Sequence, residues 1–282
     1  MDKKINVAYT DNAQTAFNKA KSYLFKDKIN NNIFISILEE RIKFPQPGNY
    51  WCIEKDEQVV GFALQSPVYF QMNVSEMKKD ALEALSLKIK EQNLQIPAFF
   101  GVADTVTALE KIWKKINWVS IIPTMRLQYY YLDKLKTELC KNEAIRTASK
   151  KDFEKVKELI LNFYDEINEK AENIDQLLLH DIESKLIWVY EHENRITSIL
   201  RYTIQSRDAI RIKNVYTPIP DRNKGYGTCL VSCFCKSKEN HTIMLFTDAV
   251  NPAANTMYQK IGFKHKNNWA RYSINYLAND IE

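Results

Sequence analysis

One segment, residues 209–263, constrains the fold of this chain more than any other. It opens with a strand pattern, in which Ile210 and Ile212 alternate with charged residues. Gly225 and Gly227 follow, two of only six glycines in the chain. Apolar residues then recur at helical spacing. The segment therefore predicts a strand, a glycine loop and the N-terminus of a helix.

The alternation of the strand slips before the loop. Asn214 stands where an apolar residue is expected, and Val215 then resumes the apolar pattern. Such a slip predicts a β-bulge, which leaves a backbone group unpaired and available.

The glycine loop suits an anionic ligand. Backbone without a Cβ can approach a ligand closely, and the N-terminus of a helix attracts a phosphate. Arg222 and Lys224 add positive charge. The loop is no P-loop, because its lysine precedes Gly225, and no dinucleotide fingerprint, because Leu230 replaces the third glycine. A tight strand-to-helix turn with surface charges explains the pattern equally well.

A second strand and helix are expected after this unit. Residues 243–246 form an apolar run that is typical of a buried parallel strand. Asn251 suits an N-cap position and Pro252 the first position of a helix. Gly262 can end that helix.

Composition limits the class of protein and its partners. The 282 residues are 45% hydrophobic and 27% charged, which is typical of soluble globular proteins with one or two domains. The net charge of +5 fits an anionic ligand and is too weak to favour nucleic acid. The start lacks an apolar signal region and no run approaches eighteen apolar residues, so we expect neither a signal peptide nor a membrane span.

The five cysteines are expected to be thiols in a cytoplasmic protein. Cys229, Cys233 and Cys235 cluster, but their spacing is not that of a zinc site, and no histidine stands at ligand spacing. We therefore expect no metal.

The chain is expected to consist of two similarly built halves. Each contains a helical run followed by a hairpin; in the second half the helix covers residues 153–163. The hairpin turns are "KDEQ" and "HEN". We predict an α/β fold (an α+β mixed sheet) with domains at 1–138 and 139–282.

Two motifs in the second half resemble the GNAT acyltransferase superfamily. Its signature R/Q-x-x-G-x-G/A reads here Arg222-Asn223-Lys224-Gly225-Tyr226-Gly227. Its later signature N-x-x-A/S-x-x-x-Y…G-F reads Asn251, Ala254, Tyr258, Gly262, Phe263. The resemblance is specific from about residue 215 to 263 and looser before residue 141. It is nearest to a bacterial branch with a degenerate GNAT-like N-terminal half.

The resemblance implies that acetyl-CoA is the acyl donor. It would lie in a V-shaped gap between the strand ending at Thr217 and the strand ending near Asp248. The N–H exposed by the bulge would polarise the thioester carbonyl. The implied donor-binding residues are Val215, Tyr216 and Thr217 along the pantetheine arm, Arg222, Asn223, Lys224, Gly225, Tyr226, Gly227 and Thr228 around the pyrophosphate, and Asn251 and Ala254 of the second signature.

Two residues are candidates for catalysis. Tyr258 matches the general acid of the family, because a phenol with a pKa of about 10 can protonate a thiolate whose thiol has a pKa of about 8.5. It also fits a tyrosine packed on the inner face of its helix. The strand with the bulge carries no glutamate to act as base, which leaves Glu166, on an earlier helix, or a base acting through water. Glu166 also fits a solvated helix face.

The resemblance implies an N-acetyltransferase that moves an acetyl group from acetyl-CoA to a small-molecule or peptide amine by direct attack. The N-terminal half lacks the glycine loop around Gly101, so we expect it not to bind CoA. A non-catalytic acyl-CoA-binding or sensing module stays an alternative. An aminoacyl transferase that uses charged tRNA is a further one, which the intact CoA loop disfavours. No nucleic-acid or membrane partner is expected, and the oligomeric state stays open.

Overall fold

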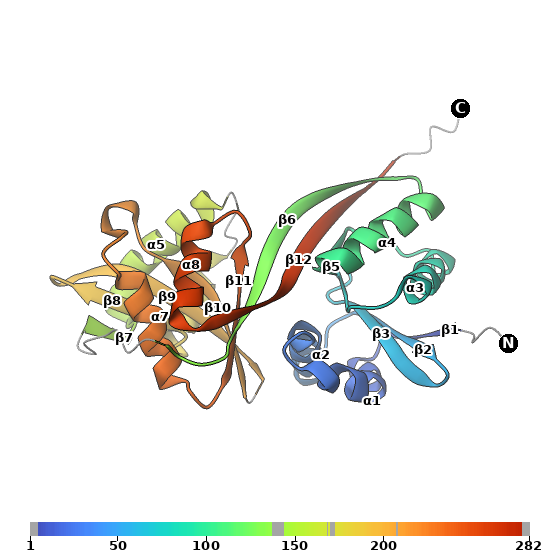
Figure 1. Ribbon diagram of the computed structural model, residues 1–282, viewed down its shortest axis with the longest axis horizontal. Helices are drawn as coiled ribbons and strands as arrows, with labels where there is room; N and C mark the ends of the chain where they lie inside the picture. Colours follow the sequence, from blue (N-terminus) through green and yellow to red (C-terminus); the bar gives the residue numbers. More distant parts are fainter. Residues whose placement is uncertain (1–4, 137–143, 168, 170–172, 207, 278–282) are drawn as a thin grey trace. The chain divides into compact units, whose positions relative to one another are not determined.

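The computed structural model describes residues 5–136, 144–167, 169, 173–206 and 208–277 (Figure 1). The chain forms two compact units. The first unit comprises residues 1–128 and 266–282, and the second comprises residues 129–265. The unit boundaries fall inside two long strands, β6 (Val119–Leu132) and β12 (Phe263–Tyr276).

The first unit is a mixed sheet with helices. Its strands follow the order β1-β2-β3-β4-β5-β12, and only β4 and β5 are parallel among the pairs with a described register. Residues 98–102 of β5 pair with residues 269–273 of β12. The elements before β6 are β1 (Ile5–Thr10), α1 (Ala13–Leu24), α2 (Asn32–Lys43), β2 (Asn49–Lys55), β3 (Gln58–Gln65), β4 (Met72–Val74), α3 (Lys79–Glu91), β5 (Ala98–Val102) and α4 (Ala103–Ile116).

The strands of the second unit follow the order β6-β11-β10-β9-β8-β7 and are also mixed in direction. Neighbouring strands from β7 to β10 are antiparallel, and β10 and β11 are parallel. Its elements are β7 (Ile145–Thr147), α5 (Phe153–Glu166), α6 (Ile174–Glu183), β8 (Ile187–His192), β9 (Arg195–Ser206), β10 (Ala209–Tyr216), α7 (Tyr226–Ser237), β11 (Thr242–Asp248) and α8 (Pro252–Ile261).

Each face of the second sheet is covered by a different helix pair. Helices α7 and α8, which lie next to each other in Figure 1, pack on Leu200, Ile210 and Leu245. Helices α5 and α6 pack on Val189, Ile199 and Tyr216. Side chains that alternate along β9 and β10 therefore enter two separate cores.

The predicted elements of the second unit are confirmed. Helix α5 begins at Phe153, and the turn between β8 and β9 is Glu193 and Asn194, both with positive φ. Asn251 caps α8 with its side chain, and Gly262 ends α8 with φ +123°. The mixed α/β fold class is likewise confirmed.

The compact units differ in extent from the predicted domains 1–138 and 139–282, which stay a prediction. Residues 266–276 of β12 belong to the first unit, because they pair with β5 and bury Ala270 and Ile274 in its core. The division into a degenerate half and an active half stays a prediction.

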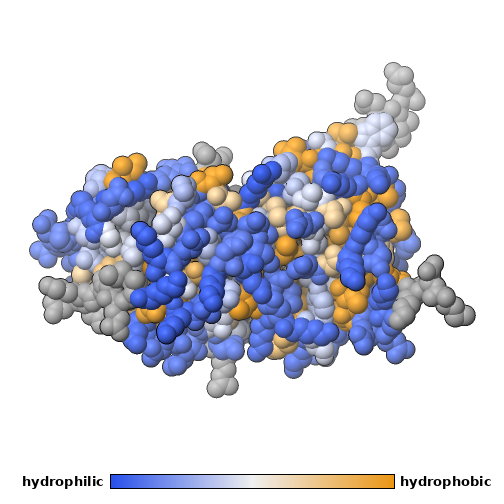
Figure 2. Space-filling model, viewed as in Figure 1, coloured by the Kyte–Doolittle hydropathy of each residue, from blue (hydrophilic) through white to orange (hydrophobic). Residues whose placement is uncertain are grey.

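The surface, the helices and the cysteines of the described residues can be compared with the predictions of no membrane span and of free thiols. Figure 2 shows a face on which hydrophilic residues predominate and hydrophobic ones are scattered. Within the described ranges, no helix is long and apolar enough to cross a membrane. Cys52, Cys233 and Cys235 are free, whereas Cys229 is disulfide-bonded, so the expectation of thiols is wrong at Cys229. Cys140 lies outside the described residues.

Candidate functional site

Strands β10 and β11 pair over only part of their length. Their parallel register runs from Ala209 opposite Thr242 to Ile212 opposite Leu245. Strand β10 continues to Tyr216 along β9, while β11 continues to Asp248. The two strands therefore part at the end from which the loop and α7 emerge.

The predicted bulge lies where the two strands part. The register of β10 against β9 shifts between Ile212 and Asn214, so Lys213 is the extra residue. This confirms the irregularity expected at Asn214. The ladder between β10 and β9 is thus irregular at the point where β10 and β11 part.

The glycine loop leads directly into the first turn of α7. Gly225 is its N-cap residue with φ +83°, and no side chain caps the helix. The first N–H groups of a helix lack partners within the helix, so they remain available to a ligand. A Cβ on Gly227 would lie 3.1 Å from the Thr217 hydroxyl oxygen. The small residue therefore lets α7 approach the end of β10.

Arg222 is held by a carboxylate instead of projecting freely from the loop. Its Nη2 atom donates to both oxygens of Glu166, at 2.6 and 2.7 Å. Its Nε atom donates to the Thr217 carbonyl at 2.9 Å. The Tyr216 hydroxyl also donates to Glu166, at 3.0 Å. Glu166 thus ties the end of α5 to the loop and to the end of β10.

A buried carboxylate organises the rest of the loop. Asp221 is 2% exposed and accepts two hydrogen bonds from Arg195, at 2.6 and 2.9 Å. Lys224 donates to it at 3.2 Å. The Arg195 guanidinium, followed by Lys224, lowers the pKa of Asp221 to about 2. Two cations are thereby anchored beside the N-terminus of α7.

Aromatic rings flank this cationic end. Tyr226 stacks on Tyr190 with ring centroids 4.9 Å apart. The centroid of the His192 ring lies 5.2 Å from that of Tyr226. The Tyr190 and His192 rings come from β8, so sequence motifs around the loop do not reveal them. Of the remaining predicted loop residues, Asn223 adopts φ +63° and Thr228 lies in the first turn of α7.

The predicted arm-binding residues lie along the diverging end of β10. Tyr216 is buried in the α5–α6 core, while Val215 packs against the α7–α8 core. The Thr217 hydroxyl is 2.9 Å from that of Ser198. Asn251 and Ala254 lie across the gap, where the Asn251 side chain accepts from the Ala254 N–H at 3.0 Å.

Sequence reasoning missed Asn255, the next residue of α8. It is 8% exposed, and its Nδ2 atom donates to the Asp248 carbonyl at 3.3 Å. Its Oδ1 atom is buried without a hydrogen-bond partner. A buried amide beside the end of β11 is a signal only once the fold is known.

Tyr258 lies within the α7–α8 core. Its ring is 5.6 Å from that of Phe263 and 6.5 Å from that of Tyr130. Burial, followed by the proximity of Cys235, raises the pKa of its phenol. The phenol is therefore protonated at neutral pH. Because Glu166 contacts Tyr216 of the opposite core, the structure does not bring the two candidate catalytic side chains together.

A buried ion pair lies beneath the bulge. Asp181 of α6 pairs with Arg201 of β9, and both side chains are almost fully buried. Arg201 also donates to the Oδ1 atom of Asn214 at 3.4 Å. The irregular residue of β10 is thus connected through β9 to α6.

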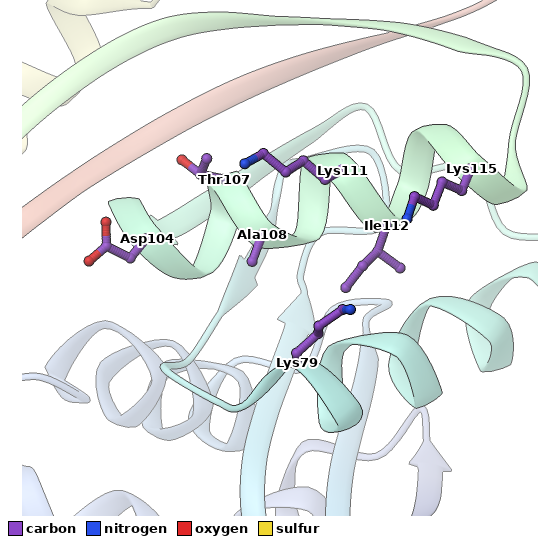
Figure 3. Close-up of a pocket in the computed structure, with 7 residues that line it drawn as sticks. All are labelled: Lys79, Asp104, Thr107, Ala108, Lys111, Ile112 and Lys115. Carbon is purple, nitrogen blue, oxygen red and sulfur yellow. The ribbon is translucent and has the colours of Figure 1, made fainter.

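The first unit contains a hollow that is lined partly by lysine side chains and lies outside the site described above. It measures about 320 Å³ and is lined by Lys79 at the start of α3 and by residues of α4. Figure 3 shows Ile112 of α4 pointing towards Lys79, with Asp104, Lys111 and Lys115 also on α4. Within the described ranges, no group of three or more histidine, cysteine or acidic residues is suited to a metal ion.

The second unit matches a known family. Residues 183–265 match the model of the acetyltransferase (GNAT) domain. This range includes the bulge, the glycine loop, α7 and α8. No curated protein matches the chain in sequence.

Solved structures similar to the chain share its fold at low sequence identity. A GCN5-related N-acetyltransferase from Sphaerobacter thermophilus is 14% identical with a TM-score of 0.62, covering 95% of this chain and 94% of its own. A GNAT-family acetyltransferase from Colwellia psychrerythraea is 13% identical with a TM-score of 0.55, and the match covers 97% of this chain and 100% of its own.

A tandem GNAT protein from the clavulanic acid biosynthesis pathway is 8% identical with a TM-score of 0.54, covering 95% of this chain and 98% of its own. The matches over nearly the whole chain extend the likeness of fold to the first unit. The family match itself is confined to residues 183–265, which are similar to the acetyltransferase (GNAT) domain.

Proposed function

We propose that the protein is an N-acetyltransferase that uses acetyl-CoA to acetylate an amine. The observation that carries this proposal is the continuous unit of parted strands, bulge, glycine loop and uncapped helix. The parted strands expose backbone groups to an extended acyl-CoA arm. The free N–H groups of α7, with Lys224 beside them, suit the pyrophosphate.

The chemistry is a direct transfer. The amine nitrogen attacks the thioester carbonyl carbon, a C–N bond forms and the C–S bond breaks. A backbone N–H of β10 near the bulge donates to the developing oxyanion. The departing thiolate takes a proton from Tyr258, whose phenol is protonated at neutral pH because burial raises its pKa. The attacking amine loses its proton to water or to a base.

Glu166 is a weaker candidate for that base than the sequence suggests. Both of its oxygens accept hydrogen bonds from Arg222, and one also accepts from Tyr216. The carboxylate oxygens are therefore already engaged by the loop and by the end of β10. We propose that its main role is to hold the loop.

Thermal unfolding with and without acetyl-CoA tests the donor. Acetyl-CoA at 100 times its Kd should stabilise the folded protein by about 2.7 kcal/mol, whereas NADH and ATP should do so less. Gly225→Asp, which places negative charge in the loop, should abolish the shift. Gly225→Ala is the matched control, because it has the same backbone strain without the charge and should keep most of the shift.

Turnover separates the enzyme from a sensing module. Release of the CoA thiol with a panel of amines should occur in the wild type and fall in Tyr258→Phe, with the acetyl-CoA shift retained. A protein that binds acetyl-CoA and acetylates no amine would favour the non-catalytic alternative. A well-folded sample that acetyl-CoA does not stabilise would contradict both.

A further inference from the structure

Arg211 occupies an unusual position in the middle of β10. Its neighbours Ile210 and Ile212 point into the α7–α8 core. Because side chains alternate along a strand, Arg211 lies on the opposite face of the sheet. The register places Thr203 of β9 and Met244 of β11 directly beside it.

Further side chains extend this position into a row across four strands. The Tyr129 hydroxyl on β6 donates to the Met244 sulfur at 2.9 Å. Gln205 on β9 donates to the Thr203 hydroxyl at 2.6 Å. Neighbouring pairs thus link Tyr129, Met244, Arg211, Thr203 and Gln205, which we term the Arg211 row. Tyr129 and Met244 are each 1% exposed, and Gln205 is 9% exposed.

In the part of the chain that the structure describes, two polar groups of the Arg211 row, those of Arg211 and Gln205, lack an ionic and a hydrogen-bond partner, respectively. Arg211 is partly buried and forms no ion pair with a carboxylate among the described residues, and burial lowers the pKa of its guanidinium. The Oε1 atom of Gln205 is buried without a hydrogen-bond partner. Buried polar atoms are normally paired, and a desolvated charge without a counter-ion is strongly unfavourable. The row therefore has the features of a site that a polar, anionic ligand completes.

The row lies next to the proposed reaction site. Arg211 directly precedes Ile212, where the pairing of β10 and β11 ends, and is two residues from the bulge residue Lys213. Successive strand residues are about 3.3 Å apart, so this separation is about 7 Å along the backbone. An acceptor that meets the thioester at the bulge is within reach of the long Arg211 side chain.

We propose that the Arg211 row binds a carboxylate of the acceptor, so that the acceptor is an amino acid or another amine that carries a carboxylate. This proposal rests on the proposed function. A guanidinium binds a carboxylate with two parallel hydrogen bonds. The row contains one formal positive charge, which balances a carboxylate and not a dianionic phosphate. The Gln205 Oε1 atom is available to accept an N–H from the same ligand.

Pairs of amino acids and their amides test the proposal, because they differ only in the carboxylate charge. Each pair is assayed at saturating acetyl-CoA by CoA thiol release, and the corresponding N-acetyl products are assayed by thermal shift in the CoA-bound protein. At least one acid should exceed its amide by tenfold or more in kcat/KM, and its acetylated product should bind more tightly than the acetylated amide. Arg211→Gln should remove this preference, and Arg211→Lys should restore part of it.

The control variant is Lys236→Gln, which removes one exposed cation from the far end of α7 and should retain the preference. The acetyl-CoA shift in Arg211→Gln reports on folding and donor binding. If the wild type does not bind acetyl-CoA, the proposed function itself fails. If it does, but no acid in the panel exceeds its amide in turnover or product binding, the assignment of the Arg211 row is overturned.

Discussion

Two glycines in the loop before α7 are held there for different physical reasons. Gly225 has φ +83°, yet a Cβ there would meet no atom within 4 Å. Gly227 has no such φ, but its Cβ would meet the Thr217 hydroxyl oxygen at 3.1 Å. Conformation therefore selects glycine at the first position, and close approach of α7 to β10 selects it at the second.

Substitutions at Gly225 should follow its backbone conformation. Gly225→Ala should destabilise the second unit by about 1 kcal/mol, because left-handed backbone costs a residue with a Cβ about that much. Gly225→Asn should cost less, since asparagine tolerates this conformation. Urea unfolding measures both. Equal stability of the alanine variant and the wild type would contradict the strain argument.

Glu166→Gln should affect donor binding more than chemistry. Both side chains of the pair with Arg222 are slightly more than a third exposed, so its loss should lower stability by less than about 1 kcal/mol. Freed from Glu166, Arg222 no longer fixes the loop, and we expect the KM for acetyl-CoA to change. The pH profile of kcat is the decisive measurement. A fall of kcat by about 10²–10⁴-fold with loss of its acidic limb would instead identify Glu166 as the base.

Asp221 should stabilise the folded loop in a pH-dependent way. Its pKa of about 2 in the folded protein lies below the value of about 3.9 usual for an aspartate in an unfolded chain. The stabilisation is therefore complete above about pH 4 and is lost as the pH falls towards 2. The melting temperatures of the wild type and Asp221→Asn should differ at pH 7 and converge below pH 4. A difference that stays constant over this range would contradict the argument.

At the scale of elements, local signals predict helices and turns well. The ends of α8 follow from Asn251, Pro252 and Gly262, because capping preferences act over a few neighbouring residues. The bulge of β10 likewise follows from one break in alternation. The pairing of Glu166 with Arg222 could not be predicted, because the two residues are far apart in sequence and meet only through the packing of α5 on the sheet.

Helix α6 is joined to the sheet by the buried pair of Asp181 and Arg201. Removing one partner leaves an uncompensated buried charge, so Asp181→Leu and Arg201→Leu should each cost about 3–5 kcal/mol. The double variant should lose much less than the sum, because no buried charge remains. Denaturant unfolding of the four proteins gives the coupling energy. Additive losses would show that the two charges do not depend on each other.

At the scale of the whole molecule, the first unit is built from two segments of the chain that are far apart in sequence. Strand β12 begins in the second unit and then pairs with β5 in the first, where the tilted rings of Trp269 and Phe100 have centroids 5.1 Å apart. A boundary placed from composition assumes consecutive domains. Strand pairing between residues far apart in sequence is not encoded in a local pattern, so the pairing of β12 with β5 was not predictable.

Because the two units have separate hydrophobic cores, we expect acetyl-CoA to change amide hydrogen exchange differently in each unit. The first unit has a core around Trp51, Phe99 and Trp113, and it lacks a glycine loop like that before α7. Acetyl-CoA should therefore slow amide hydrogen exchange in residues 213–230 and 248–256 more than in β5 and α4. Gly225→Asp, under the same conditions, should remove the protection of the second unit. Equal protection of β5 and α4 in the wild type would mean that the first unit also takes part in donor binding, and the assignment of the donor to the second unit alone would have to be abandoned.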